Sequence, residues 1–182
     1  MKTNIEIEFK TPLTETQYNE LIRLFELDNN IFKQTNFYFD SESLYFRKQK
    51  TVLRIRKKHN NYYKVTLKSH SDQGAFEQHV LLDEAQALKM IEAGFNTKEY
   101  FDIDCDVKLI GFLDNYRVST PYKDGELFFD KIEYIGKVDY ELEYEVDNYD
   151  LGKKCFEHFL ETHNIELKPA IRKSERIYQT KN

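Results

Sequence analysis

Glycine and proline are scarce in this sequence, with six and three copies among 182 residues. That scarcity excludes collagen-like, linker-rich and low-complexity architectures. The two cysteines, Cys105 and Cys155, form neither a disulfide framework nor a zinc motif. No apolar run approaches the roughly 18 residues of a membrane-spanning helix, and no secretory segment is recognisable. We therefore expect a cytoplasmic protein without a membrane partner.

Charged and aromatic side chains are abundant instead. The chain has 27 Lys and Arg, 32 Asp and Glu, 13 Tyr and 14 Phe. A disordered chain would not carry so many aromatic rings, so a folded globular protein is expected. The length suits a single domain spanning residues 1–182. The net charge of −5 argues against a general nucleic-acid partner.

Apolar and polar residues alternate with period two in most of the chain, which is the pattern of half-buried strands. The expected strands are Ile5–Lys10, Asn36–Asp40, Val52–Arg56, Tyr63–Lys68, Phe76–Val80, Asn115–Ser119, Leu127–Asp130 and Tyr140–Val146. Short turns such as Asn60-Asn61 favour antiparallel pairing. The pattern predicts an α+β fold with about eight antiparallel strands and helices packed outside.

Helices are expected in five places. A capping box at Thr14 opens the first, and Asp83 opens a second, with Leu88 and Ile91 inward and Gly94 at its end. The others are 106–113, a segment from about 150 to 163 that buries Leu151, and a short helix after Pro169.

The polar faces of the strands are sorted by sign. One strand carries Glu6 and Glu8, and a late strand carries Glu141, Glu143 and Glu145; between them lie strands with Arg54 and Arg56 and with Lys64 and Lys68. Like charges side by side repel, so a compensating ligand is expected. If helices cover the apolar faces, the charged faces line the lumen of a closed barrel. Clustered Arg and Lys suit a polyphosphate, and clustered carboxylates suit Mg²⁺ or Mn²⁺.

Glu6-x-Glu8-x-Lys10 resembles the ExExK signature of the CYTH domain, the superfamily of triphosphate tunnel metalloenzymes. Later segments resemble that family in the same order: Arg54-x-Arg56, Lys64 and Lys68, Glu77, Arg117, Phe129-Asp130, Glu141-x-Glu143, the Arg172–Arg176 segment with Lys173, and Thr35–Asp40, which is similar to a stretch of the bacterial YjbK-like subgroup. The resemblance implies a closed eight-stranded antiparallel barrel that holds a triphosphate.

The resemblance also implies roles for individual residues. The metal ligands would be Glu6, Glu8, Glu77, Asp130, Glu141 and Glu143. The phosphate contacts would be Arg54, Arg56, Lys64, Lys68, Arg117 and Lys173. The catalytic residues would be Lys10, Arg117 and Lys173. Several alternatives stay open. Glu77 is either a ligand or a salt-bridge partner, and Lys10 either holds a phosphate or separates the two acids. Glu143/Glu145 competes with Glu141/Glu143 as the second pair, and Lys168 competes with Lys173.

The expected activity is hydrolysis of inorganic or organic triphosphate with Mg²⁺ or Mn²⁺ as cofactor, by a monomer or homodimer. One alternative is a class IV-type adenylyl cyclase, which would use the same lumen to convert ATP to cyclic AMP and pyrophosphate. A second is a non-catalytic polyphosphate or nucleotide sensor. The full set of acids and bases argues against the sensor, since a binder needs fewer metal ligands.

Overall fold

The computed structural model describes residues 2–59, 62–71 and 74–179. Its strands are β1 (Lys2–Leu13), β2 (Phe32–Asp40), β3 (Thr51–Lys58), β4 (Tyr62–Ser71), β5 (Gly74–Leu82), β6 (Phe95–Asn96), β7 (Asp106–Tyr122), β8 (Gly125–Tyr134) and β9 (Lys137–Val146). Its α-helices are α1 (Glu15–Leu24), α2 (Tyr45–Lys48), α3 (Glu84–Ala93), α4 (Tyr149–Thr162) and α5 (Lys173–Gln179), and its 3₁₀ turns are η1 (Asp28–Asn30) and η2 (Thr97–Glu99). The expected turn at Asn60-Asn61 lies outside the described residues. Among the described helices, none has the length and apolar character needed to span a membrane.

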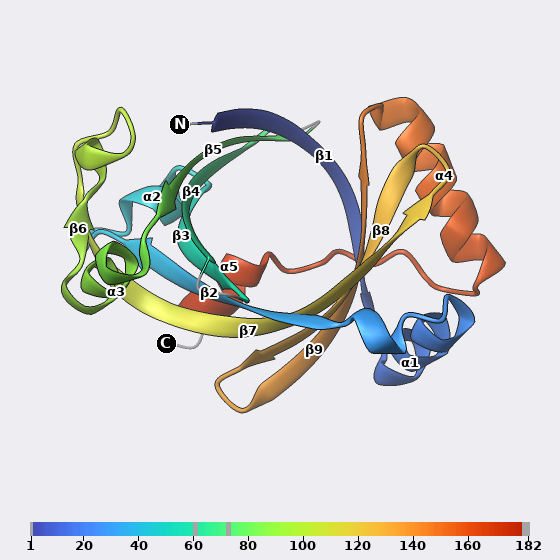
Figure 1. Cartoon of the computed structure of the whole chain (residues 1–182). Helices are drawn as coiled ribbons and strands as arrows, with labels where there is room; N and C mark the ends of the chain where they lie inside the picture. Colours follow the sequence, from blue (N-terminus) through green and yellow to red (C-terminus); the bar gives the residue numbers. More distant parts are fainter. Residues whose placement is uncertain (1, 60–61, 72–73, 180–182) are drawn as a thin grey trace. The chain divides into compact units, whose positions relative to one another are not determined.

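One sheet contains all these strands, in the hydrogen-bonded order β2-β3-β4-β5-β1-β9-β8-β7-β6 (Figure 1). An additional pairing between β2 and β7 closes the eight longer strands on themselves, and the two-residue β6 is an extra strand beside β7. The registers along β3, β4, β5, β8 and β9 are antiparallel. The predicted α+β fold, a closed eight-stranded antiparallel barrel with external helices, is confirmed.

The chain divides into two compact units. Unit 1 comprises Met1–Ile5, Gln34–Leu113 and Lys173–Asn182, and unit 2 comprises Glu6–Lys33 and Asp114–Arg172. β1 and β7 each contribute residues to both units.

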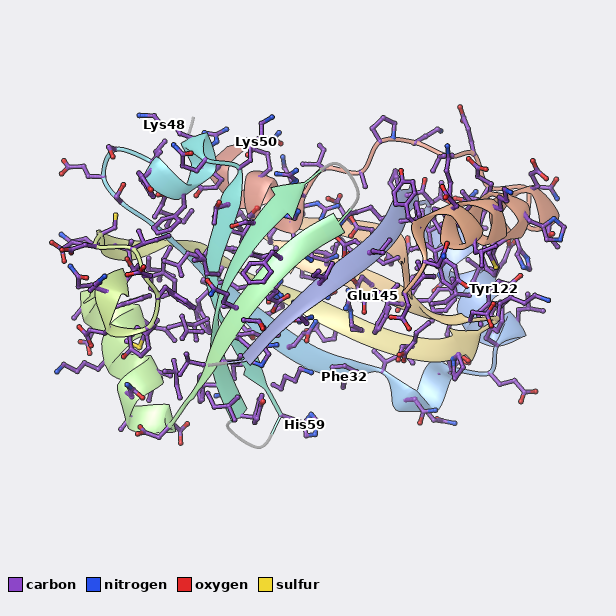
Figure 2. The ribbon with its side chains drawn as sticks, turned by 90° about the horizontal axis from the view of Figure 1, so that it is seen from above. Phe32, Lys48, Lys50, His59, Tyr122 and Glu145 are labelled. Atoms are coloured by element: carbon purple, nitrogen blue, oxygen red, sulfur yellow. The ribbon has the colours of Figure 1, made fainter. Side chains whose placement is uncertain are left out.

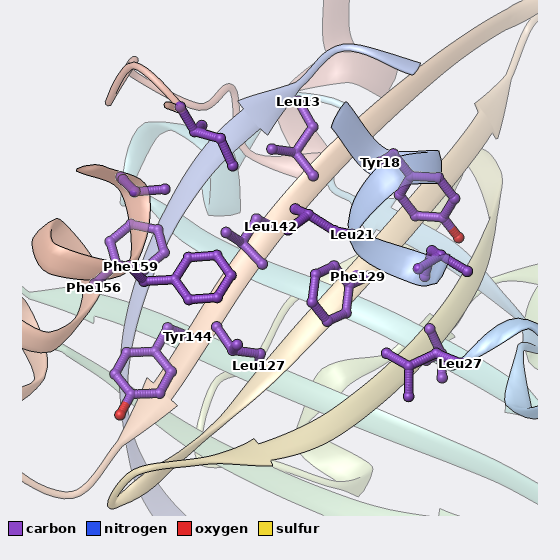
Figure 3. Close-up of a cluster of buried hydrophobic side chains, with 14 residues drawn as sticks. Leu13, Tyr18, Leu21, Leu27, Leu127, Phe129, Leu142, Tyr144, Phe156 and Phe159 are labelled. Carbon is purple, nitrogen blue, oxygen red and sulfur yellow. The ribbon is translucent and has the colours of Figure 1, made fainter. Parts of the chain in front are cut away.

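Unit 2 packs α1 and α4 on the apolar face of β8 and β9 (Figure 3). Leu142 and Tyr144 of β9 are buried there against Phe156 and Phe159 of α4. Alternation along β9 places these two residues on the face opposite its glutamates. At Gly152 of α4 an added Cβ would lie 2.4 Å from a Val146 methyl group, so the helix approaches the sheet more closely than a larger residue would permit.

Unit 1 repeats the arrangement around a second apolar cluster. Leu53 and Ile55 of β3 and Val65 and Leu67 of β4 are buried in it, together with Met90 of α3. β3 and β4 therefore also have one apolar face and one charged face.

Asp40, at the end of β2, connects two helices within unit 1. Its carboxylate accepts hydrogen bonds from the backbone N–H groups of Phe46 and Arg47 on α2, at 2.9 and 3.0 Å, and from the Tyr178 hydroxyl on α5. Arg47 also forms an ion pair with Glu175 of α5. The carboxylate thus stabilises the position of the short C-terminal helix by hydrogen bonds.

The helix starts were predicted correctly at Thr14, whose capping box is present, and at Asp83, whose side chain caps α3. The helix expected over 106–113 is wrong, because these residues begin the seventeen-residue strand β7. Leu88 and Leu151, expected inward, are 51% and 61% exposed. In both cases another face of the helix packs against the core, through Ala87 and Met90 of α3 and through Gly152 and Phe156 of α4.

Candidate functional site

Unit 2 gathers carboxylates on the charged face of β1, β8 and β9. On β9, Glu141, Glu143 and Glu145 alternate with buried apolar residues and therefore share one face. Across the strand pairs, Glu8 of β1 lies opposite Glu145, and Asp130 of β8 lies opposite Glu141. We call these five residues the acidic cluster.

Arg117 of β7 holds two members of the acidic cluster. Its Nε and Nη2 donate to the two oxygens of Asp130 at 2.7 and 2.6 Å, and its guanidinium also pairs with Glu143. Burial lowers the pKa of Arg117, but the two carboxylates more than offset this and raise it well above its usual value. Asn115 Nδ2 donates to Asp130 Oδ1 at 3.0 Å. Arg117, expected to contact phosphate, therefore lies in a buried network with two predicted metal ligands.

Two overlapping sets of carboxylates have the donor arrangement of a cation site. In the set of Glu8, Glu143 and Glu145, and again in that of Asp130, Glu141 and Glu143, one oxygen of each residue lies within 4.8 Å of the others. All donors are oxygen atoms, the ligands that Mg²⁺ and Mn²⁺ prefer. The residues thus fit the implied metal, and Glu143 belongs to both sets.

Glu145 shows the repulsion between these acids. Its pKa is raised to about 7, mainly by burial; Arg117 acts to lower it, while Glu6, Glu143 and Glu8 contribute to the increase. Figure 2 labels Glu145 on β9 and Tyr122 on β7. The ring of Tyr122 lies in the apolar core, with its centroid 5.1 Å from that of the Phe159 ring. Glu145 thus lies among like charges.

Lys10 partly compensates these acids. Its Nζ lies 2.7 Å from Glu8 Oε1 and 3.6 Å from Glu143 Oε1. This geometry fits the role of separating the two carboxylates. Glu6 belongs to neither set among the described residues, although it acts electrostatically on Glu145.

Unit 1 gathers the cations on the charged face of β3 and β4. Arg56 lies opposite Lys64, and Lys68 lies opposite Glu77 of β5. Glu77 Oε1 lies 3.8 Å from Arg54 Nη2 and 3.6 Å from Lys64 Nζ, and the side chain is 2% exposed. We call Arg54, Arg56, Lys64 and Lys68 the basic cluster.

Glu77 does not suffice to neutralise the basic cluster. Burial lowers the pKa of Lys64, and although Glu77 raises it, Arg54 and Arg56 lower it further. The positive charges therefore still repel each other around Lys64. Of the two alternatives for Glu77, its contacts within unit 1 fit the salt-bridge partner, and neither carboxylate set among the described residues includes it.

Lys173 begins α5 in unit 1 and is partly exposed. Its rival Lys168 lies in unit 2, with its Nζ 3.0 Å from Glu166 and its side chain 57% exposed. The backbone N–H of Lys168 donates to Thr11 Oγ1 at 3.0 Å. The main chain of Lys168 therefore has a partly buried contact, whereas its ammonium group forms an exposed ion pair.

Sequence reasoning missed two amides that hold charged site residues. Asn115 donates to Asp130, and Asn36 Oδ1 accepts from Arg56 Nε at 2.7 Å. Asn115 lies on the same face of β7 as Arg117, and Asn36 of β2 lies directly opposite Arg56 of β3. Parity along the strand could have identified Asn115, since it is two residues before Arg117. For Asn36 the contact depends on the register of β2 with β3.

Comparison with known proteins agrees with this geometry. Residues 4–178 match the family model of the CYTH domain. The chain is 32% identical, over all of its length and 98% of the relative, to a Bacillus subtilis (strain 168) protein named "Putative triphosphatase YjbK". The crystal structure of a "putative adenylate cyclase" from Bacillus halodurans is similar to it, with a TM-score of 0.88 and 28% identity over 97% of this chain and 98% of that chain.

A more distant structure shares the fold. It is that of HpAC1 from Hippeastrum, described as a "putative adenylyl cyclase" with a dominant triphosphatase activity. Its TM-score is 0.80, at 20% identity over 96% of each chain.

Proposed function

Because the chain belongs to the CYTH domain family, we propose that it is a divalent-metal-dependent triphosphatase. The substrate class is inorganic triphosphate or an organic triphosphate. The observation that carries the proposal is the basic cluster, whose four buried or half-buried cations lie together on the charged face of β3 and β4. Burial lowers the pKa of Lys64, and repulsion from Arg54 and Arg56 lowers it further. A polyanion removes that repulsion when it binds.

In this proposal the basic cluster binds and orients the phosphate chain. Arg54 and Arg56 can each donate paired hydrogen bonds to phosphate oxygens, which fixes direction as well as charge. Lys64 adds a compact positive charge. Phosphoryl transfer spreads negative charge over the equatorial oxygens, so fixed cations at these oxygens stabilise the transition state.

The acidic cluster would hold the metal. Glu143 is the central ligand because both carboxylate sets contain it, and Glu8, Asp130, Glu141 and Glu145 are the other candidates. When bound, Mg²⁺ or Mn²⁺ supplies positive charge to phosphate oxygens and activates a water molecule. Arg117 and Lys10 keep the carboxylates apart and oriented by their ion pairs.

The test is a substrate panel of inorganic triphosphate, thiamine triphosphate, ATP and GTP, each with Mg²⁺ and with Mn²⁺. We expect phosphate release from at least one triphosphate, and none after chelation. Cyclic AMP and pyrophosphate from ATP, without phosphate, would contradict the hydrolase and favour the adenylyl cyclase. Binding of triphosphate without any product would favour the sensor.

The two C-terminal lysines provide a matched pair of variants. Lys173→Ala is expected to lower kcat/KM for triphosphate about tenfold or more, since it removes a cation expected at the phosphates. Lys168→Ala is expected to change kcat/KM little, because the ammonium group pairs with Glu166 at the surface and the main-chain contact to Thr11 remains. Steady-state kinetics of both variants checks this. A reversed ranking would show that Lys168, not Lys173, acts on the substrate.

A further inference from the structure

The strand face that carries the basic cluster also carries uncharged polar side chains. Asn36 and Tyr38 of β2 and Thr66 of β4 are at most 2% exposed. Asn36 lies opposite Arg56; Tyr38 lies opposite Arg54, which in turn lies opposite Thr66. Directly opposite residues of antiparallel strands share a face. The two arginines are thus bordered by three uncharged polar residues.

Each of these three residues has a buried polar atom without a hydrogen-bond partner among residues 2–59, 62–71 and 74–179. The atoms are Asn36 Nδ2, the Tyr38 hydroxyl and Thr66 Oγ1. Buried polar groups in folded proteins are nearly always paired. Three of them on one face, beside a cluster of cations, indicate that their partner is a ligand.

All three atoms can donate. Asn36 Oδ1 accepts from Arg56 Nε at 2.7 Å, and since a guanidinium only donates, this contact fixes the oxygen toward Arg56 and leaves the NH₂ group as the unpaired one. The hydroxyls of Tyr38 and Thr66 donate as readily as they accept. A set of donors next to fixed cations matches the oxygens of an anion, which only accept.

We propose that Asn36, Tyr38 and Thr66 are further substrate-binding residues, which donate hydrogen bonds to oxygens of the phosphate chain held by Arg54 and Arg56. This inference rests on the proposed triphosphate substrate. In this inference, uncharged residues contribute to triphosphate recognition. Their hydrogen bonds set the position of phosphate oxygens without adding positive charge. Asn36 has a second role as a positioning residue, because it holds Arg56.

The experiment measures apo thermal stability and calorimetric binding of inorganic triphosphate for Tyr38→Phe and Thr66→Val. Each substitution removes an unpaired buried hydroxyl and keeps the shape of the side chain. We expect the apo melting temperature to rise by about 2–4 °C. We expect the affinity for triphosphate to fall about tenfold, because a hydrogen bond to a charged oxygen is lost.

Two variants with satisfied hydroxyls serve as controls. Tyr63 of β4 faces the apolar cluster and donates to Glu84 at 3.5 Å. Tyr63→Phe is therefore expected to leave triphosphate affinity unchanged, without raising the melting temperature. Thr97 Oγ1 donates to the Ile103 carbonyl at 2.7 Å. Thr97→Val is expected to lower the melting temperature, the opposite sign from Thr66→Val.

A lowered melting temperature in both Tyr38→Phe and Thr66→Val would overturn the inference, since their hydroxyls would then be structural. Unchanged triphosphate affinity in both variants would also overturn the inference. Hydrolysis of triphosphate by the wild type would in that case leave the proposed function intact. Conversely, the wild type could bind triphosphate without hydrolysing it while the variants bind more weakly. That result would support the three hydrogen-bond donors and refute the proposed hydrolase.

Discussion

Asp130→Leu is expected to lower the free energy of unfolding by about 3–5 kcal/mol. Asp130 is fully buried and accepts two hydrogen bonds from Arg117 and one from Asn115. Without it, a buried guanidinium loses its bidentate partner, and removing one member of a buried ion pair costs far more than the pair contributes in net terms. Urea denaturation followed by circular dichroism measures the change, which suits a chain without tryptophan.

Arg117→Met combined with Asp130→Leu tests the cause. The double variant is expected to regain part of the loss, because it no longer buries a guanidinium that has lost its bidentate partner. Glu133→Leu on the same strand is the control, since Glu133 pairs with Lys131 at the surface with 37% of each side chain exposed. Its effect is expected to stay below about 1 kcal/mol. If Asp130→Leu matched this control, the buried network would not contribute to stability.

Glu143→Gln is expected to lower turnover of triphosphate about a hundredfold or more. The substitution keeps the side-chain shape but removes the carboxylate that both sets of oxygen donors share. Losing a ligand of the metal removes charge stabilisation from the transition state, and each factor of ten corresponds to about 1.4 kcal/mol. Activity assays over a range of Mn²⁺ concentrations measure the effect.

Direct Mn²⁺ binding, followed by electron paramagnetic resonance, separates the two carboxylate sets. Glu143→Gln is expected to weaken binding more than Glu141→Gln or Glu145→Gln, each of which belongs to only one set. Of Glu141→Gln and Glu145→Gln, the variant that binds Mn²⁺ more weakly identifies the carboxylate set that holds the ion. Glu157→Gln, an exposed residue of α4 paired with Lys153, is the control and should bind Mn²⁺ like the wild type. Normal Mn²⁺ affinity in Glu143→Gln would refute the metal site.

Much of the fold follows from local sequence. Period-two alternation identified every strand of the barrel, because side chains on a strand alternate between an apolar and a polar environment. Thr14 and Asp83 marked helix starts because their side chains accept hydrogen bonds from unpaired N–H groups of the first turn. The segment 106–113 was misread because a strand with partly buried side chains on both faces lacks clean alternation.

For the candidate site, the sequence by itself determined which residues carry charge on a shared strand face. Glu141, Glu143 and Glu145 are two residues apart, so no tertiary information is needed to place them together. The same holds for Arg54 and Arg56. The order of these segments along the chain was sufficient for the resemblance to the CYTH domain, to which the chain belongs.

Only the tertiary structure decided which charges lie near each other across strands. The register of β4 with β5 places Glu77 near Arg54 and Lys64, and that of β7 with β8 places Arg117 beside Asp130. A one-residue shift of register would move every side chain of a strand to the other face. Register depends on turns and on packing of the apolar faces, so strand periodicity alone does not fix ion pairs between residues distant in the chain.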